Sequence, residues 1–379
     1  MKTLGWFSRK SPVPTLHCLI FGGGDSADEK ARQNQPLQSG FEEKRGQEMP
    51  EKIQRRKKIW LLIERKEEIC MEKKVLLALD DSIHSMHAVK YAVGLPCLVK
   101  GATFTLFHVQ PTISQFLLDE AKTDFKARAE LDKLVRKNAE HSRDMMEKYK
   151  NYMVRMGIAE KCIDVATQPR VLGLVKDILE HAEKGRYDAI VVGRRGLSRV
   201  QKAFMGSVTT KLVEHSGVIP VWVVDGEVTS QRFIVAIDGS EASLRAVDHL
   251  AFIIGPIPDI KVALFHVVPK LGGRFGVSFG KKDADLEQAF AETDKKHLNR
   301  FFEQAQEKFN EAGMPEGQVE FKVATRTGNV GKAIVDEAKK GDYGTVVVGR
   351  RGISKAFFMG SVSRCVIDNS SKRALWLVS

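Results

Sequence analysis

The chain contains one long segment twice. Tyr187-Asp-Ala-Ile-Val-Val-Gly-Arg-Arg-Gly-Leu-Ser returns 156 positions later as Tyr343-Gly-Thr-Val-Val-Val-Gly-Arg-Arg-Gly-Ile-Ser, and both copies then reach Met-Gly-Ser-Val. Two earlier pairs keep the same order: Val75-Leu-Leu-Ala-Leu-Asp80 matches Ile234-Val-Ala-Ile-Asp238, and Phe107-His-Val109 matches Phe265-His-Val267. Since a duplicated unit fixes domain boundaries before any secondary structure is assigned, the repeat predicts two domains, over residues 73–225 and 231–379.

Each unit alternates short Val, Ile and Leu runs with longer segments of helical period. This alternation is typical of β-α-β units, so we predict an α/β chain with a five-stranded parallel sheet per unit and helices on both faces. The expected strands of the first unit are 74–80, 102–109, 162–167, 187–193 and 218–224, and its expected helices are 83–95, 117–156, 170–184 and 207–216. The expected strands of the second unit are 232–238, 260–268, 318–324, 343–349 and 373–378.

Residues 1–72 have no counterpart in the repeat. Their prolines, mixed charges and the run Gly22-Gly-Gly24 favour a disordered extension with a short helix at 51–69. An alternative is that this stretch is not translated, because Lys66-Glu67-Glu68 can be encoded by a purine run that resembles a bacterial ribosome-binding site shortly before Met71. A peptide from residues 1–70 of the natural protein would contradict that alternative.

The composition limits the class of partner. A net charge of +12 and a pI near 9.3 make nucleic acid, anionic lipid or a phosphorylated ligand candidate partners. The basic residues are spread with acidic ones over helix surfaces, which predicts no nucleic-acid partner, and no apolar run approaches the roughly 18 residues of a membrane span. The five cysteines form no CxxC pair, so we expect a cytoplasmic protein in a reducing compartment.

The Gly-Arg-Arg-Gly loop predicts a phosphate site in the first unit. Gly193 ends a strand at the carboxyl edge of the sheet, where open α/β sheets bind ligands. Gly193, Gly196 and Gly206 would let backbone amides approach a phosphate closely. Ser207 is expected to be the N-cap of a helix whose positive end favours an anion, and Arg194 adds charge nearby.

Gly193-Arg-Arg-Gly196, nine further residues and Gly206-Ser207 resemble the universal stress protein family, whose nucleotide-binding members carry this spacing before their last helix and strand. The resemblance covers about residues 73–379 in two copies. It implies Rossmann-like domains, of the adenine nucleotide alpha hydrolase-like type, that bind ATP with or without Mg²⁺. Asp80 and the backbone near Val109 would face adenosine. Ribose and phosphates would lie against the remaining residues of the implied site, which are Gly193, Arg194, Gly196, Gly206, Ser207 and Val208.

The second copy departs more from the family pattern than the first. The first has Asp81-Ser82 after its strand where the family often has Gly-Ser, whereas the second keeps Asp238-Gly-Ser240. In the second loop, however, seven residues separate the glycines instead of nine, so we rank this nucleotide site below the first. Its implied residues are Asp238, Val267, Gly349, Gly352, Gly360 and Ser361.

The resemblance implies a stress-response protein that acts as a nucleotide-dependent regulator or signalling module. A dedicated enzyme is disfavoured, because the chain has no GxxxxGK[ST] motif and no kinase-like HRD or DFG set, so no catalytic residue is assigned. His84 and His87 lack supporting ligands, and no metal site is predicted. Two alternatives stay open, an interaction protein that keeps the fold without binding nucleotide and a slow ATP hydrolase.

Family members commonly pair through their last strands. Two fused units could make this pair within one chain, with 226–230 as the linker, and a further homodimer is compatible with that arrangement.

Overall fold

A computed structural model describes residues 73–99, 101–195, 205–255, 257, 259–269, 284–315, 317–326, 329–350 and 360–379. The expectations for residues 1–72, for Gly196 and for Gly352 lie outside the described residues.

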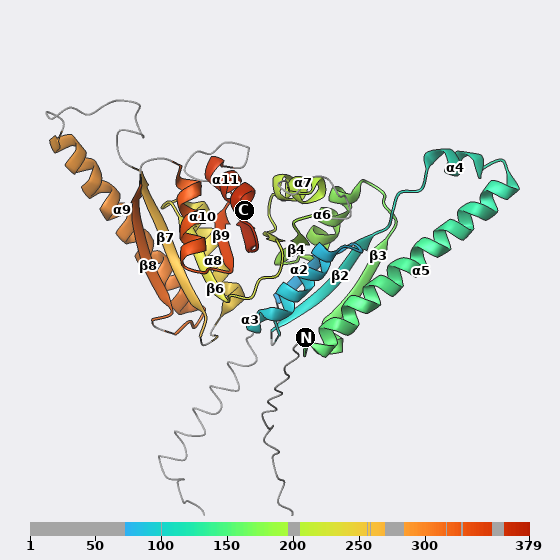
Figure 1. Ribbon diagram of the computed structural model, residues 1–379, viewed down its shortest axis with the longest axis horizontal. Coiled ribbons are helices and arrows are strands. Elements are labelled where there is room, and N and C mark those ends of the chain that lie inside the picture. The colour runs from blue at the N-terminus through green and yellow to red at the C-terminus, as the bar shows by residue number, and fades with distance from the viewer. Residues whose placement is uncertain are drawn as a thin grey trace, which may run out of the picture. The chain divides into compact units, whose positions relative to one another are not determined.

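The first repeat is built on five parallel strands, as its sequence predicts (Figure 1). They are β1 (Lys73–Ala78), β2 (Ala102–Val109), β3 (Ile163–Gln168), β4 (Ala189–Gly193) and β5 (Val221–Val224). Their order in the sheet is β3-β2-β1-β4-β5. The helices are α2 (Ile83–Gly94), α3 (Pro96–Val99), α4 (Gln115–Glu120), α5 (Phe125–Arg155), α6 (Leu174–Gly185) and α7 (Ser207–His215), and a 3-10 turn covers Glu160–Cys162.

The second repeat has the same strand order and again five parallel strands, which confirms the α/β prediction. The strands are β6 (Arg232–Ile237), β7 (Lys261–Pro269), β8 (Val319–Arg326), β9 (Thr345–Gly349) and β10 (Ala374–Val378). The helices are α8 (Glu241–Ile254), α9 (Ala284–Glu311), α10 (Val330–Lys340) and α11 (Ser361–Asn369).

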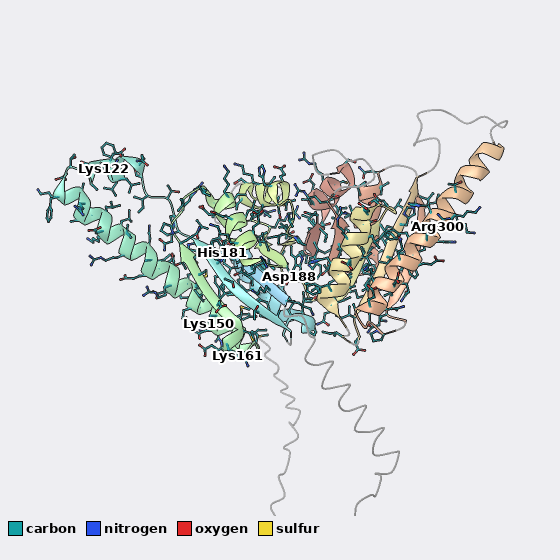
Figure 2. All side chains as sticks on the ribbon, turned by 180° about the vertical axis from the view of Figure 1, so that it is seen from behind. Lys122, Lys150, Lys161, His181, Asp188 and Arg300 are labelled. Atoms are coloured by element: carbon teal, nitrogen blue, oxygen red, sulfur yellow. The ribbon has the colours of Figure 1, made fainter. Side chains whose placement is uncertain are left out.

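The helix expected over 117–156 is two helices in the structure. The Asp124 carboxylate accepts hydrogen bonds from the backbone N–H of Lys126 at 3.3 Å and of Ala127 at 3.0 Å, and so caps a new helix. Figure 1 shows α4 and the first turns of α5 extending past the sheet, and Figure 2 shows Lys122 at that far end and Lys150 at the other. An N-cap inside a polar, helix-compatible segment therefore divides the predicted helix.

Two hydrophobic cores cover the two faces of the sheet. In β1, Leu77 packs in the core on the side of α2 and α5, while its neighbour Leu76 packs in the core on the side of α6 and α7. Both side chains are fully buried. Burial on both faces explains why inner strands such as β1 and β4 are continuous apolar runs, whereas the largely exposed edge strand β3 mixes polar with apolar residues.

Strands β5 and β10 lie side by side and antiparallel, and each brings a tryptophan to the contact. Trp222 and Trp376 are partners in register, and their rings stack with centroids 3.9 Å apart. The indole of Trp222 donates to His249 Nε2 on α8 at 3.2 Å, and that of Trp376 donates to the Tyr91 hydroxyl on α2 at 2.9 Å. Each indole N–H thus finds its acceptor on a helix of the opposite repeat.

His249 makes this contact sensitive to pH. Burial lowers the pKa of His249 to about 3, whereas in the unfolded chain it is about 6.5. The unfolded chain therefore binds a proton below pH 6.5 that the folded chain excludes. The stability contributed by neutral His249 is complete above pH 6.5 and is lost as the pH falls from there towards 3, by at most about 1.4 kcal/mol per pH unit.

We expect His249→Tyr, which copies Tyr91 on the matching helix, to flatten the decline of stability between pH 6.5 and 4. Urea unfolding followed by circular dichroism at several pH values measures this decline. His141→Tyr is the matched control, because His141 is exposed on α5 and its 3.9 Å contact with Asp81 is a surface ion pair that contributes little to stability, so the slope should hardly change. A His249→Tyr slope equal to that of the parent protein would contradict the prediction.

Candidate functional site

A pocket opens in the first repeat at the carboxyl ends of β1, β2 and β4, between α6 and α7. This is the edge where parallel α/β sheets place their ligands. Four of the predicted residues line the pocket: Asp80, Val109, Gly193 and Val208. Its wall also includes the apolar side chains of Leu79, Phe107, Leu174 and Ile178. One pocket thus contains an apolar surface together with residues predicted to face adenosine and residues predicted to hold the phosphates.

Asp80 is fixed in the pocket wall by hydrogen bonds to the start of α2. Its Oδ1 accepts from the hydroxyls of Ser82 at 2.5 Å and Ser85 at 2.7 Å. Ser82 also caps α2, because its hydroxyl accepts from the backbone N–H of Ser85. The Tyr149 hydroxyl on α5 donates to the Asp80 carbonyl at 2.8 Å, and burial, followed by the Asp80 charge, raises the pKa of Tyr149. Asp81 in place of the family's glycine leaves this serine contact intact.

Packing against α2 requires glycine at position 193. A Cβ at this position would lie 2.6 Å from the carbonyl carbon and oxygen of His84 on α2. In the second repeat, a Cβ at Gly349 would lie 2.8 Å from the carbonyl oxygen of Ala242. In both repeats the last strand residue before the loop must therefore be glycine so that the first helix can approach the sheet.

Helix α7 begins at the pocket without a side-chain cap. Gly206, rather than the expected Ser207, is the N-cap, and its own N–H donates to the Arg194 carbonyl at 2.9 Å. The Thr209 hydroxyl ties the first turn to the Gly193 carbonyl at 3.0 Å. Among the residues that the structure describes, no side chain accepts from the first-turn amides, including those of Ser207 and Val208. A helix start of this kind favours an anion.

The two arginines of the loop have different surroundings. The Arg194 side chain is buried and donates to the carbonyls of Ile367 at 3.0 Å and Asp368 at 3.3 Å, at the end of α11. Arg195 lines the pocket instead. Burial, and then the positive charge of Arg195, lower the pKa of His84 beside the pocket. The prediction of Arg194 as a side chain of this site is therefore wrong, because that side chain points to α11, and its neighbour Arg195 lines the pocket with the predicted residues.

The second repeat places its predicted residues at matching positions. Asp238 follows β6, Val267 lies in β7, Gly349 ends β9, and Gly360 is the N-cap of α11, which begins at Ser361. Ser240 donates to Asp238 Oδ1 at 2.5 Å, as Ser82 does to Asp80.

The two repeats differ, however, in the side chain that contacts the turn between the first strand and the first helix. In the second repeat His297 of α9 lies against the turn, with its Nε2 3.2 Å from the Gly239 carbonyl, where Tyr149 of α5 donates to Asp80 in the first. The two sites thus differ in their walls as well as in loop length.

The universal stress protein family model matches residues 71–225 and 229–376, and so covers both repeats. The chain belongs to the universal stress protein family. Among curated protein sequences, none matches it.

Solved structures match this universal stress protein, and one of them does so with a TM-score above 0.5. A universal stress protein from Archaeoglobus fulgidus DSM 4304 is 20% identical over 82% of this chain and 99% of its own, with a TM-score of 0.53. UspA from Lactobacillus plantarum is 15% identical over 39% of this chain and 97% of its own, with a TM-score of 0.32. A universal stress protein in complex with cAMP is 22% identical over 39% of this chain and 96% of its own, with a TM-score of 0.28.

Asp177 is a site residue that the sequence analysis missed in this universal stress protein. Its buried carboxylate accepts from the backbone N–H groups of Val171 at 3.0 Å, Leu172 at 2.8 Å and Gly173 at 3.3 Å. These bonds fix the loop that leads into α6 and so place Leu174 in the pocket wall. The helix expected over 170–184 places Asp177 two turns from its start, whereas α6 begins at Leu174 and so has Asp177 in its first turn.

Within the described ranges, no helix is long and apolar enough to span a membrane. The same residues contain no group of three or more His, Cys, Asp or Glu side chains that could hold a metal ion.

Proposed function

We propose that this universal stress protein binds adenine nucleotide, with ATP as its ligand, in the pocket of the first repeat. The observation that carries the proposal is the uncapped start of α7 at an apolar pocket that Asp80 also lines. The first-turn amides of α7, from Ser207 and Val208, would hold phosphate, with Arg195 as the nearby cation. The apolar wall that includes Phe107 and Ile178 suits the adenine base, and Asp80 and the Val109 backbone would face adenosine.

We infer a regulator or signalling module rather than a dedicated enzyme. Asp80 is the one carboxylate among the described pocket residues, and two serine hydroxyls already bond its Oδ1. A general base for hydrolysis would have to reach a water beside the terminal phosphate. The proposal therefore makes nucleotide occupancy, rather than turnover, the functional output, with or without Mg²⁺ bound to the phosphates.

We propose further that residues 73–225 and 231–379 act as two domains that pair within one chain. The antiparallel contact of β5 with β10 and the Trp222–Trp376 stack support this arrangement. The pair should elute as a monomer in size-exclusion chromatography with light scattering. The uncapped α11 supports a second nucleotide site there, of lower affinity because its loop is shorter. Free Cys162 and Cys365 suit a reducing cytoplasm.

The test is to purify the protein, denature it and assay the supernatant for adenine nucleotide. Calorimetric titration with ATP, ADP and cAMP, each with and without Mg²⁺, then gives affinity and stoichiometry, and GTP serves as the control for the base. We expect ATP to bind better than GTP. The absence of both co-purified nucleotide and ATP binding would overturn the proposal and favour the interaction-protein alternative. Turnover that Gly206→Asp abolishes would favour the hydrolase.

A further inference from the structure

Two arginines at equivalent positions each bond the opposite repeat through their side chains. Arg194 follows β4 and Arg350 follows β9, and both are buried with 6% of their surface exposed. Arg350 donates through its Nη atoms to the carbonyls of Ser216 and Glu214, at the C-terminal end of α7. Arg194 makes the same kind of contact with the end of α11 and lies 3.6 Å from the Asp225 carboxylate. Each arginine therefore starts in one glycine loop and ends on the last helix of the other repeat.

The main chain of each arginine is also part of its own loop. The Arg350 N–H donates to Val378 at the end of β10 at 2.6 Å, and the Arg350 carbonyl accepts from the N–H of Gly360, the N-cap of α11, at 3.2 Å. Arg194 repeats both bonds, to Val224 and from Gly206. A single residue thus connects the last strand and the last helix of its own repeat with the last helix of the other.

The C-terminal end of α7 favours binding of a guanidinium group. The last carbonyls of a helix lack intrahelical partners and carry the negative end of its dipole. A planar guanidinium can bond several of them at once and holds the helix end in one position. Because α7 has nine residues, its two ends are only about 13 Å apart, so fixing one end also fixes the direction of the first-turn amides at the other.

We propose that Arg350 of the second repeat is a positioning residue for the nucleotide site of the first repeat, and that Arg194 has the same role for the second site. This inference rests on the proposed nucleotide binding. It adds that each site is completed by the opposite repeat through the C-terminal end of the helix that holds the phosphates. Since the Arg350 main chain belongs to the second loop, a ligand in either site changes the affinity of the other, and the coupling is reciprocal.

Arg350→Met tests the proposal, because methionine keeps the length of the side chain and removes its charge and donors. Gly360→Asp is included in every protein so that calorimetry reports the first site alone. We expect Arg350→Met to weaken ATP binding about 10-fold, and Arg350→Lys, which keeps the charge without the planar fork, to recover part of the loss. Arg364→Met is the matched control. It breaks an exposed 3.2 Å ion pair between Arg364 of α11 and Glu214 of α7, and it should not change the affinity.

The outcomes separate this inference from the function on which it rests. If the parent protein binds no ATP, the proposed function fails and the inference with it. If the parent binds ATP and a folded Arg350→Met protein binds it equally well, only the inference is overturned.

Hydrogen exchange tests the inference without the Arg350 variants, and so covers the case in which they do not fold. In the Gly360→Asp protein, in which the second site is blocked, ATP should slow amide exchange at the start of α7 and also in the peptide 346–350 of the second repeat, but not in the edge strand β8. Protection of α7 alone would overturn the coupling.

Discussion

Trp376→Ala is expected to lower the free energy of unfolding by about 3–5 kcal/mol, the largest stability effect that the structure predicts. Trp376 is fully buried, stacks on Trp222 at 3.9 Å and meets the edge of the Phe233 ring at 5.5 Å. Truncation would remove this area, leave a cavity between two strands that cannot collapse independently, and deprive the Tyr91 hydroxyl of its indole donor. Urea unfolding followed by circular dichroism measures the loss.

Trp376→Phe is the control, because it keeps an aromatic ring in the stack and removes the indole N–H. Its loss should be about half that of the alanine variant, since most of the buried area remains. An alanine variant that loses less than about 1 kcal/mol would mean that the contact between β5 and β10 is not packed in solution.

Gly206→Asp should separate the stability of the protein from the proposed nucleotide binding. The Gly206 backbone has φ −60° and ψ 147°, which aspartate adopts readily at an N-cap. Its carboxylate would accept the first-turn amides of α7 and raise the stability of the helix by roughly 0.5 kcal/mol. The same carboxylate would take the place of the phosphate and repel it, so ATP affinity should fall on the order of 100-fold, or about 2.7 kcal/mol.

The matched variant is Gly360→Asp, at the same position of α11. If the first site is the stronger one, Gly360→Asp removes only the weaker phase of the titration, and both variants unfold at or above the temperature of the parent protein. Unchanged ATP affinity in Gly206→Asp would exclude the start of α7 as the phosphate site. A matching loss of stability and affinity would mean that the variant acts by unfolding the helix.

The sheet could be predicted from sequence because its inner strands are buried on both faces, which leaves uninterrupted runs such as Ile190 to Val192. The division between α4 and α5 could not be predicted. An aspartate such as Asp124 is compatible with a helix interior, and it acts as an N-cap only where the backbone leaves the helical conformation.

At the site, Arg194 and Arg195 are chemically identical neighbours, and only the position of α11 decides which one lines the pocket. The reason for Gly193 was equally hidden, because it depends on the carbonyl of His84, over one hundred positions earlier in the sequence.

The antiparallel contact between β5 and β10 has a consequence for how the two halves can change. In a symmetric dimer of one repeat, every substitution at the contact appears twice and must be compatible with itself. Here Tyr91 accepts the hydrogen bond of one tryptophan and His249 that of the other. Each repeat therefore needs to be complementary only to the other repeat and not to a copy of itself. One half is then free to specialise, or to give up its ligand, while it continues to support the other. If the halves were produced as separate polypeptides, the mixed pair should form in preference to either like pair.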